Sequence, residues 1–234
     1  MSLPSIRLGF TPVINCSYLP EQQEQLGVVI DHRWLTVSGY SALLGSGFRR
    51  SGQAIYKPMC EHCQACTPLR IDCDHFAPSK TQKRQQKQLA GFRAEFKPTL
   101  DEDWFPLYEQ YIRQRHAHGA MYPANRQQFF EFSQANWMET YFLHLYEDDR
   151  LIAIAVTDFL DQALSAVYTF FDPNHPLSLG TLCVLKQIDY CRETGRRWLY
   201  PGYQIDDCPA MNYKTRYKPY QKLVQGKWQS MICP

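Results

Sequence analysis

The chain has 234 residues, 44% of them hydrophobic and 21% charged, which is the ordinary balance of a soluble globular protein. Its longest aliphatic run, residues 151–156, is far shorter than the ~20 residues of a membrane span, and the N-terminus lacks a signal-peptide layout. A formal net charge of +2 favours no class of partner. Disorder, membrane insertion and export are therefore poor interpretations, and we expect a cytoplasmic protein.

The first 98 residues are irregular, basic and rich in cysteine, so we expect residues 1–98 to form an N-terminal region. Their composition predicts short strands at 28–30 and 34–37, a glycine-rich mobile or ligand-facing loop at 45–52, and a basic helix at 80–89. This region shows no continuous helix or strand periodicity that would indicate a large core of its own.

Residues 99–234 have clearer patterns and are expected to form a second domain. Thr99 and Glu102 have capping-box spacing ahead of an amphipathic helix, and Asn125 is placed to cap another. The full prediction for this domain is helices at 99–119 and 125–137, strands at 141–146, 150–158 and 163–171, a helix at 178–193 and a strand at 197–203.

A hairpin, a third strand, a helix and a last strand form the core order of an α/β (α+β) fold of the N-acetyltransferase-like (GNAT/Fem-like) type, with a mixed sheet. In that arrangement the strands flanking the helix separate and the helix N-terminus faces the opening, where its N–H groups favour an anion. Residues 177–181 lack the glycine-rich basic loop that holds coenzyme A. Coenzyme A is thus disfavoured as the acyl donor.

Cys60, Cys63 and Cys66 have a C-x2-C-x2-C spacing that lets thiolates converge on one centre, as in zinc and iron–sulfur loops. Cys16, His62 and Cys73 are the candidates for a fourth ligand. The nine cysteines of a cytosolic chain are expected to be reduced. Metal or cluster binding, redox-sensitive thiols without metal, and simple packing all remain open at this motif.

Two further segments are rich in cations. Lys80, Lys83, Arg84 and Lys87 alternate with amide side chains, a composition that suits nucleic-acid phosphates but also an ordinary solvated helix face. The segment 200–219 combines tyrosines with cations after a predicted strand, and it suits either a carboxylate site or a loop packed on the sheet. His144, among apolar neighbours in a strand, is expected to be structural.

Several segments in order resemble the bacterial aspartate/glutamate leucyltransferases, relatives of the eukaryotic arginyl-tRNA–protein transferases. The resemblance extends over nearly the whole chain and rests on the following matches: Gly47-Phe-Arg-Arg-Ser-Gly52, Tyr56-Lys-Pro-x-Cys60, Cys66-x-Pro-x-Arg70, Phe76-x-Pro-Ser79-x-x-Gln82-x-Arg84, Ala166-Val-Tyr-Thr-Phe-Phe-Asp-Pro173 and Met211-x-Tyr-Lys214. It implies transfer of leucine from leucyl-tRNA to proteins with N-terminal Asp or Glu, which marks them for degradation as N-degrons.

The resemblance also implies partners and cofactors, and the chemistry of the residues suggests their roles in such a transfer. Leucyl-tRNA and proteins with N-terminal Asp or Glu would be the partners, with no DNA or membrane involved. No cofactor is required for transfer. The relatives imply haem or an iron–sulfur cluster at the cysteines, and the cysteine spacing also allows zinc. The expected roles are catalysis by Tyr168 and Tyr203, binding of the substrate carboxylate by Lys214, Arg216 and Tyr213, tRNA contacts by Arg49, Arg50, Lys80, Lys83, Arg84 and Lys87, and metal binding by Cys16, Cys60, Cys63 and Cys66.

Three other functions stay open on the sequence. Arginyl transfer would need a buried acid in the donor pocket. A non-catalytic, metal-stabilised RNA-binding protein would transfer nothing, and an ordinary acetyltransferase would bind acetyl-coenzyme A.

Overall fold

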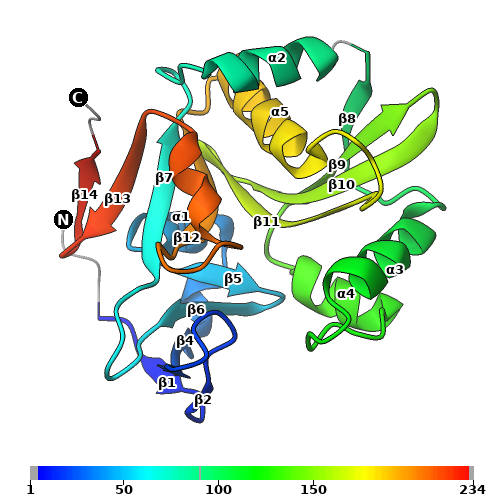
Figure 1. Ribbon diagram of the computed structural model, residues 1–234. Helices are drawn as coiled ribbons and strands as arrows, with labels where there is room; N and C mark the ends of the chain where they lie inside the picture. The colour runs from blue at the N-terminus through cyan, green and yellow to red at the C-terminus, as the bar shows by residue number, and fades with distance from the viewer. Residues whose placement is uncertain (1–4, 90, 232–234) are drawn as a thin grey trace.

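The computed structural model describes residues 5–89 and 91–231, and its centre is a large mixed sheet (Figure 1). The eight strands of this sheet lie in the order β14-β13-β7-β12-β11-β10-β9-β8. Their bounds are Lys227–Ser230, Tyr220–Val224, Thr67–Asp72, Trp198–Gln204, Ala163–Phe171, Arg150–Phe159, Thr140–Glu147 and Arg93–Lys97.

Helices cover both faces of this sheet. Helix α5 packs on β10, β11 and β12, and α2 packs on α5, whereas α3 packs on β10 and β11 from the opposite face together with α4 (Figure 1). The bounds are Lys80–Leu89 for α2, Trp104–Arg115 for α3, Arg126–Ser133 for α4 and Leu179–Glu193 for α5. The fold is the predicted α/β, N-acetyltransferase-like arrangement.

The centre of the sheet agrees closely with the sequence prediction. Strands β9, β10 and β11 form the expected antiparallel meander. Asp148 and Asp149 make the turn between β9 and β10, with φ values of 46° and 66° that these residues tolerate better than most. Helix α5 and strand β12 follow at the predicted places.

A smaller four-stranded sheet of order β1-β4-β6-β5 lies beside the large one, with helix α1. The bounds of the N-terminal elements are Leu8–Phe10 for β1, Ile14–Asn15 for β2, Gln23–Glu24 for β3, Leu26–Val29 for β4, Val37–Gly45 for α1, Arg49–Ser51 for β5 and Ala54–Pro58 for β6, with a 3₁₀ turn η1 at His32–Trp34. Strands β7 and β8 also precede residue 98 but belong to the large sheet. The expected division at 98 therefore does not fall between two sheets.

Three local predictions are wrong. Residues 34–37 are not a strand: Thr36 accepts the Gly39 N–H as the N-cap of α1. Residues 49–51 form β5 rather than a mobile loop. The predicted capping box at Thr99 does not form, and α3 starts at Trp104.

The start of α4 is as predicted, because the Asn125 side chain accepts the Gln128 N–H, although this helix ends at Ser133 instead of Trp137.

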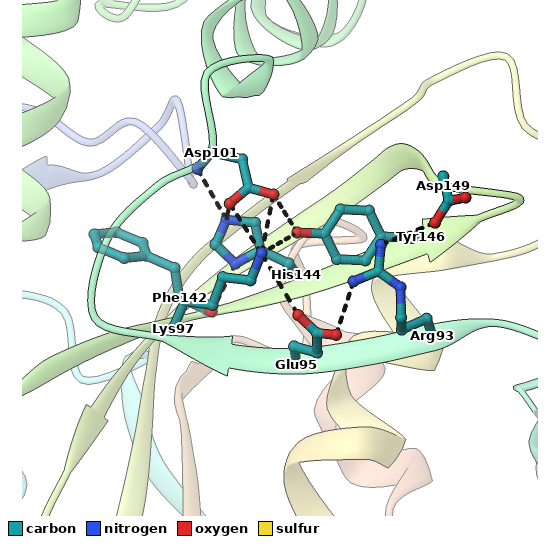
Figure 2. A network of polar contacts seen from close by, with 8 residues as sticks. All are labelled: Arg93, Glu95, Lys97, Asp101, Phe142, His144, Tyr146 and Asp149. Atoms are coloured by element: carbon teal, nitrogen blue, oxygen red, sulfur yellow. Dashed lines mark hydrogen bonds and ion pairs between the residues drawn. The ribbon is translucent and has the colours of Figure 1, made fainter.

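Strand β8 is the last strand of the large sheet, and a polar network helps to join it to β9 (Figure 2). His144 on β9 is fully buried; its Nδ1 lies 2.9 Å from the Phe142 carbonyl, and its Nε2 accepts the Asp101 N–H at 3.3 Å. Asp101 in turn bonds the Lys97 ammonium and the Tyr146 hydroxyl. Burial lowers the pKa of His144 and favours the neutral ring, so the structural role expected for His144 is confirmed.

No helix in residues 5–89 and 91–231 is long and apolar enough to cross a membrane.

Candidate functional site

Strands β11 and β12 separate in the middle of the large sheet, and we call the place where they part the opening. These strands pair in parallel only over residues 163–165 and 198–200. Beyond that point β11 carries a bulge at Val167, and residues 166–169 are half-buried although β10 beside them is buried along nearly its whole length. Bulges often lie next to active sites because they redirect side chains. This opening is therefore the candidate site.

Lys214 enters the site from the 3₁₀ turn η2 (Asn212–Arg216), which packs on β12. Its side chain is buried, and its Nζ lies 3.3 Å from both the carbonyl oxygen and the Sδ of Met211. The ammonium is 4.9 Å from the centre of the Tyr213 ring. Burial, helped by the charge of Arg49, lowers the pKa of Lys214 to about 8. Among the described residues no carboxylate pairs with this ammonium.

The two predicted catalytic tyrosines have different surroundings. The Tyr203 hydroxyl donates to the Gly47 carbonyl at 2.9 Å, so its proton already has an acceptor. The Tyr168 hydroxyl is buried and has no hydrogen-bond partner within the described chain, and its ring packs against Phe132 and Tyr111. Desolvation raises the pKa of Tyr168 far above its usual value, so it stays protonated and can donate.

Tyr213 and Arg216 are also on η2, in different positions. Tyr213 is half-buried beside Lys214, and burial raises its pKa. Arg216 is exposed, while its carbonyl accepts the Gln82 amide of α2 at 3.2 Å. Of the two cations predicted to bind a carboxylate, only Lys214 lies in the interior.

Arg49 and Arg50 lie in the interior, which corrects the prediction that they contact tRNA phosphates. Arg49 donates to the Tyr200 and Ala166 carbonyls, one on each side of the opening. Arg50 points the other way and forms an ion pair with Asp158, in which both side chains are 0% exposed. Neither guanidinium is on a surface that a phosphate backbone could reach in this structure.

Helix α2 presents the other predicted tRNA contacts on its surface. Lys80, Lys83, Arg84 and Lys87 are all exposed. Ser79 and Gln82 form a reciprocal capping box, in which the Ser79 N–H donates to Gln82 Oε1 at 2.8 Å and the Gln82 N–H donates to Ser79 Oγ at 3.3 Å. Since Gln82 also reaches η2, this basic helix is held next to the loop that carries Lys214.

The four predicted metal-binding cysteines gather at one cavity of about 440 Å³, which also contains Glu24. The pKa of Cys66 is raised to about 12 by burial and by the other three thiols, so the four groups are close together. No group of three or more His, Cys, Asp and Glu in residues 5–89 and 91–231 has the arrangement of a metal site. Thiolates are ligands that zinc and iron–sulfur clusters prefer, so the chemistry of the four cysteines suits a metal although their arrangement in this structure is not that of a metal site.

Comparison with known families identifies the chain. Residues 14–84 match the model of the arginine-tRNA-protein transferase N terminus, and residues 103–224 match that of its C terminus. The chain belongs to the arginine-tRNA-protein transferase family.

Full-length relatives in this family are close in sequence. The chain is 53% identical to the aspartate/glutamate leucyltransferase of Vibrio campbellii over 97% of its length and 98% of the relative's. It is 46% identical to the enzyme of the same name from Aeromonas hydrophila, over 97% and 95%. A solved C-terminal domain of a putative lysylphosphatidylglycerol synthetase from Agrobacterium fabrum aligns over 61% of this chain and 47% of that one, with a TM-score of 0.46 and 12% identity.

Proposed function

We propose that this enzyme transfers leucine from leucyl-tRNA to the α-amine of proteins that begin with Asp or Glu, and so creates N-degrons. Relatives at about half identity over nearly their whole length carry the name aspartate/glutamate leucyltransferase. The observation in this chain that carries the proposal is the Lys214 ammonium, which is buried beside β12 and has no counterion among the described residues. A buried cation of this kind suits an acidic acceptor side chain.

The reaction needs little more than correct placement of its two substrates. The acceptor amine attacks the aminoacyl ester carbonyl, the new C–N bond replaces the C–O bond to the terminal ribose, and the amine proton leaves with the ribose hydroxyl. An α-amine has a pKa of roughly 7.7–8.0, so deprotonating it at neutral pH costs about 1 kcal/mol. Holding amine and ester in attack geometry supplies about 7–11 kcal/mol. Positioning therefore dominates.

Each part of the site has a role in this scheme. Lys214 binds the acceptor carboxylate, with Tyr213 beneath its ammonium. Tyr168, whose hydroxyl is free to donate, polarises the ester carbonyl or orients the amine. Tyr203 supports the wall of the opening through Gly47. The exposed cations of α2 hold tRNA phosphates.

The cysteines are not needed for transfer. Cys16, Cys60, Cys63 and Cys66 would hold a zinc ion, an iron–sulfur cluster or a haem iron, and such a group would supply order to the N-terminal region.

The decisive test is incubation of the purified protein with radiolabelled Leu-tRNA or Arg-tRNA and peptides that begin with Asp, Glu or Ala. We expect label to pass from Leu-tRNA to the Asp and Glu peptides alone. Transfer from Arg-tRNA would assign arginine as the donor, and transfer to the Ala peptide, or no transfer, would refute the proposal.

A further inference from the structure

Two buried cations beside β12, Lys214 and Arg49, form no hydrogen bond or ion pair with a carboxylate among the described residues, although the charge of Asp158 also acts on Arg49. Lys214 is 3% exposed and Arg49 is 8% exposed. Their hydrogen bonds within the described residues go only to neutral acceptors: Lys214 to Met211, and Arg49 to the Tyr200 and Ala166 carbonyls. Burying a charge without a partner costs several kcal/mol, so such an arrangement is retained where a ligand supplies the opposite charge.

The adjacent residue shows what an internally satisfied arginine looks like in this fold. Arg50 donates to both carboxylate oxygens of Asp158, to the Thr140 hydroxyl and to the Ser133 carbonyl. Arg49, by contrast, makes only two side-chain hydrogen bonds, both to carbonyl oxygens, so other N–H groups of its guanidinium have no acceptor among the described residues. Two adjacent arginines on one strand thus have different functions.

The position of Arg49 places it between the two strands that form the opening. Tyr200 is the last residue of β12 paired with β11, and Ala166 follows the last paired residue of β11. The Arg49 guanidinium bridges their carbonyls at the point where the strands part, and its charge acts directly on Lys214. Two buried cations therefore lie beside β12 where the strands part, and Lys214 is charged below its pKa of about 8.

We infer that Arg49 and Lys214 together form the subsite that binds the side-chain carboxylate of the acceptor's first residue, and that Arg49 is a specificity residue rather than a tRNA contact. This inference rests on the proposed function and extends it. A carboxylate can accept hydrogen bonds from both cations at once, whereas the carboxamide of Asn or Gln carries no charge and would leave both unpaired. A peptide that begins with Asn or Gln is therefore expected to bind poorly, because its carboxamide would leave both buried cations without an opposite charge.

The test measures KM separately for acceptor and donor in Arg49→Gln and Arg49→Lys, using peptides that begin with Asp or Asn. Asn is preferred to Gln because an N-terminal Gln cyclises. For Arg49→Gln we expect the Asp-peptide KM to rise about tenfold or more, the preference for Asp over Asn to fall by a similar factor, and the Leu-tRNA KM to stay unchanged. Arg49→Lys keeps a positive charge and should recover part of the preference.

Arg192→Gln, the same change at an exposed arginine of α5, is the matched control, and circular dichroism melting shows whether each variant is folded. A rise in the Leu-tRNA KM, with the peptide KM unchanged, would assign Arg49 to the tRNA and overturn the inference. An unchanged Asp preference in folded Arg49→Gln would also overturn it. Absence of transfer by the wild-type protein would instead refute the proposed function. Calorimetric binding of the Asp and Asn peptides to the wild type and to Arg49→Gln then still tests the subsite.

Discussion

The buried, charged side chain of Lys214 favours ligand binding at the expense of the stability of the fold. Its ammonium is buried against Tyr213 and Met211, and the positive charge of Arg49 makes that state less favourable still. Sites that bind charged ligands commonly sacrifice stability in this way.

Replacement of Lys214 by Met separates the two effects. Lys214→Met removes a buried unpaired charge and keeps an unbranched side chain that is one atom shorter, so we expect a higher melting temperature together with an Asp-peptide KM raised about tenfold or more. Thermal unfolding measures the melting temperature, and steady-state kinetics measure the KM for the Asp peptide. A variant that is less stable and still prefers Asp peptides would contradict the role of Lys214.

The pKa of Lys214, lowered to about 8, predicts a particular pH dependence. Below that pKa the ammonium is charged and binds a carboxylate; as the pH rises through it, the charge is lost and the Asp-peptide KM should increase. Lys214→Arg keeps its charge at these pH values, so any folded, active form should not show this increase. KM measured from about pH 7 to pH 9.5 checks this, and a flat wild-type profile would contradict it.

At this scale the sequence did not show reliably where the predicted site residues lie. The Lys214 prediction agrees with a buried position in the opening, whereas Arg49 and Arg50 were assigned together to the surface. Recognising residues 49–51 as a strand would have separated the two arginines, because consecutive side chains of a strand point to opposite faces. It would not have shown that both faces are buried. The glycines around the two arginines concealed that strand.

Among the elements, β8 is held by a network whose strength depends on a neutral histidine (Figure 2). Because burial lowers the pKa of His144 in the folded state, the unfolded chain binds a proton more readily. Stability contributed by neutral His144 is present above the unfolded pKa of about 6.5 and is lost as the pH falls toward the lower folded value.

We therefore expect the free energy of unfolding to decrease on acidification below about pH 6.5, and to decrease less in His144→Gln. Urea unfolding at several pH values measures the difference between the two proteins. The comparison isolates His144, since other groups that titrate are common to both. Parallel pH profiles would show that His144 does not carry this dependence.

Helix α2 gives a separate prediction about salt. Replacing Lys83 and Arg84 by Gln leaves the capping box of Ser79 and Gln82 intact, so the helix should remain folded. For each phosphate that a cation of α2 no longer neutralises, Leu-tRNA binding should weaken and the slope of log affinity against log salt should fall by about 1, with the peptide KM unchanged. Filter binding at several salt concentrations tests this, and an unchanged slope would make α2 an ordinary solvated helix.

The elements that the sequence predicted well are those whose pattern is local and continuous. Helix α5 and the meander β9–β11 have long periodic segments, and their bounds agree within a few residues. Strands β7 and β8 were missed because β7 acquires its partners from the distant β12 and β13, and β8 pairs with β9 across two helices. No window of neighbouring residues contains that information.

At the scale of the whole molecule, the pair Arg50–Asp158 joins the small sheet to the large one. Arg50 lies on β5 and Asp158 on β10, and both side chains are fully buried. Asp158→Asn leaves the guanidinium without its counterion, so we expect a loss of about 3–5 kcal/mol in the free energy of unfolding. Replacing both residues with apolar side chains should lose less than Asp158→Asn alone. Denaturant unfolding of the single and double variants measures this, and equal losses would exclude strong coupling between the two residues.

Because β7 lies between β12 and β13, the large sheet cannot be completed until late in translation. Ile71 of β7 is paired with Leu199 on one side and Tyr220 on the other, so both partners are translated long after it. At usual bacterial rates of synthesis the delay is on the order of ten seconds. During that time β7, which carries the core residues Leu69 and Ile71, has neither of its neighbours in the sheet, and an unpaired strand is a favourable site for aggregation or for a chaperone. The central sheet is completed only when nearly the whole polypeptide has emerged.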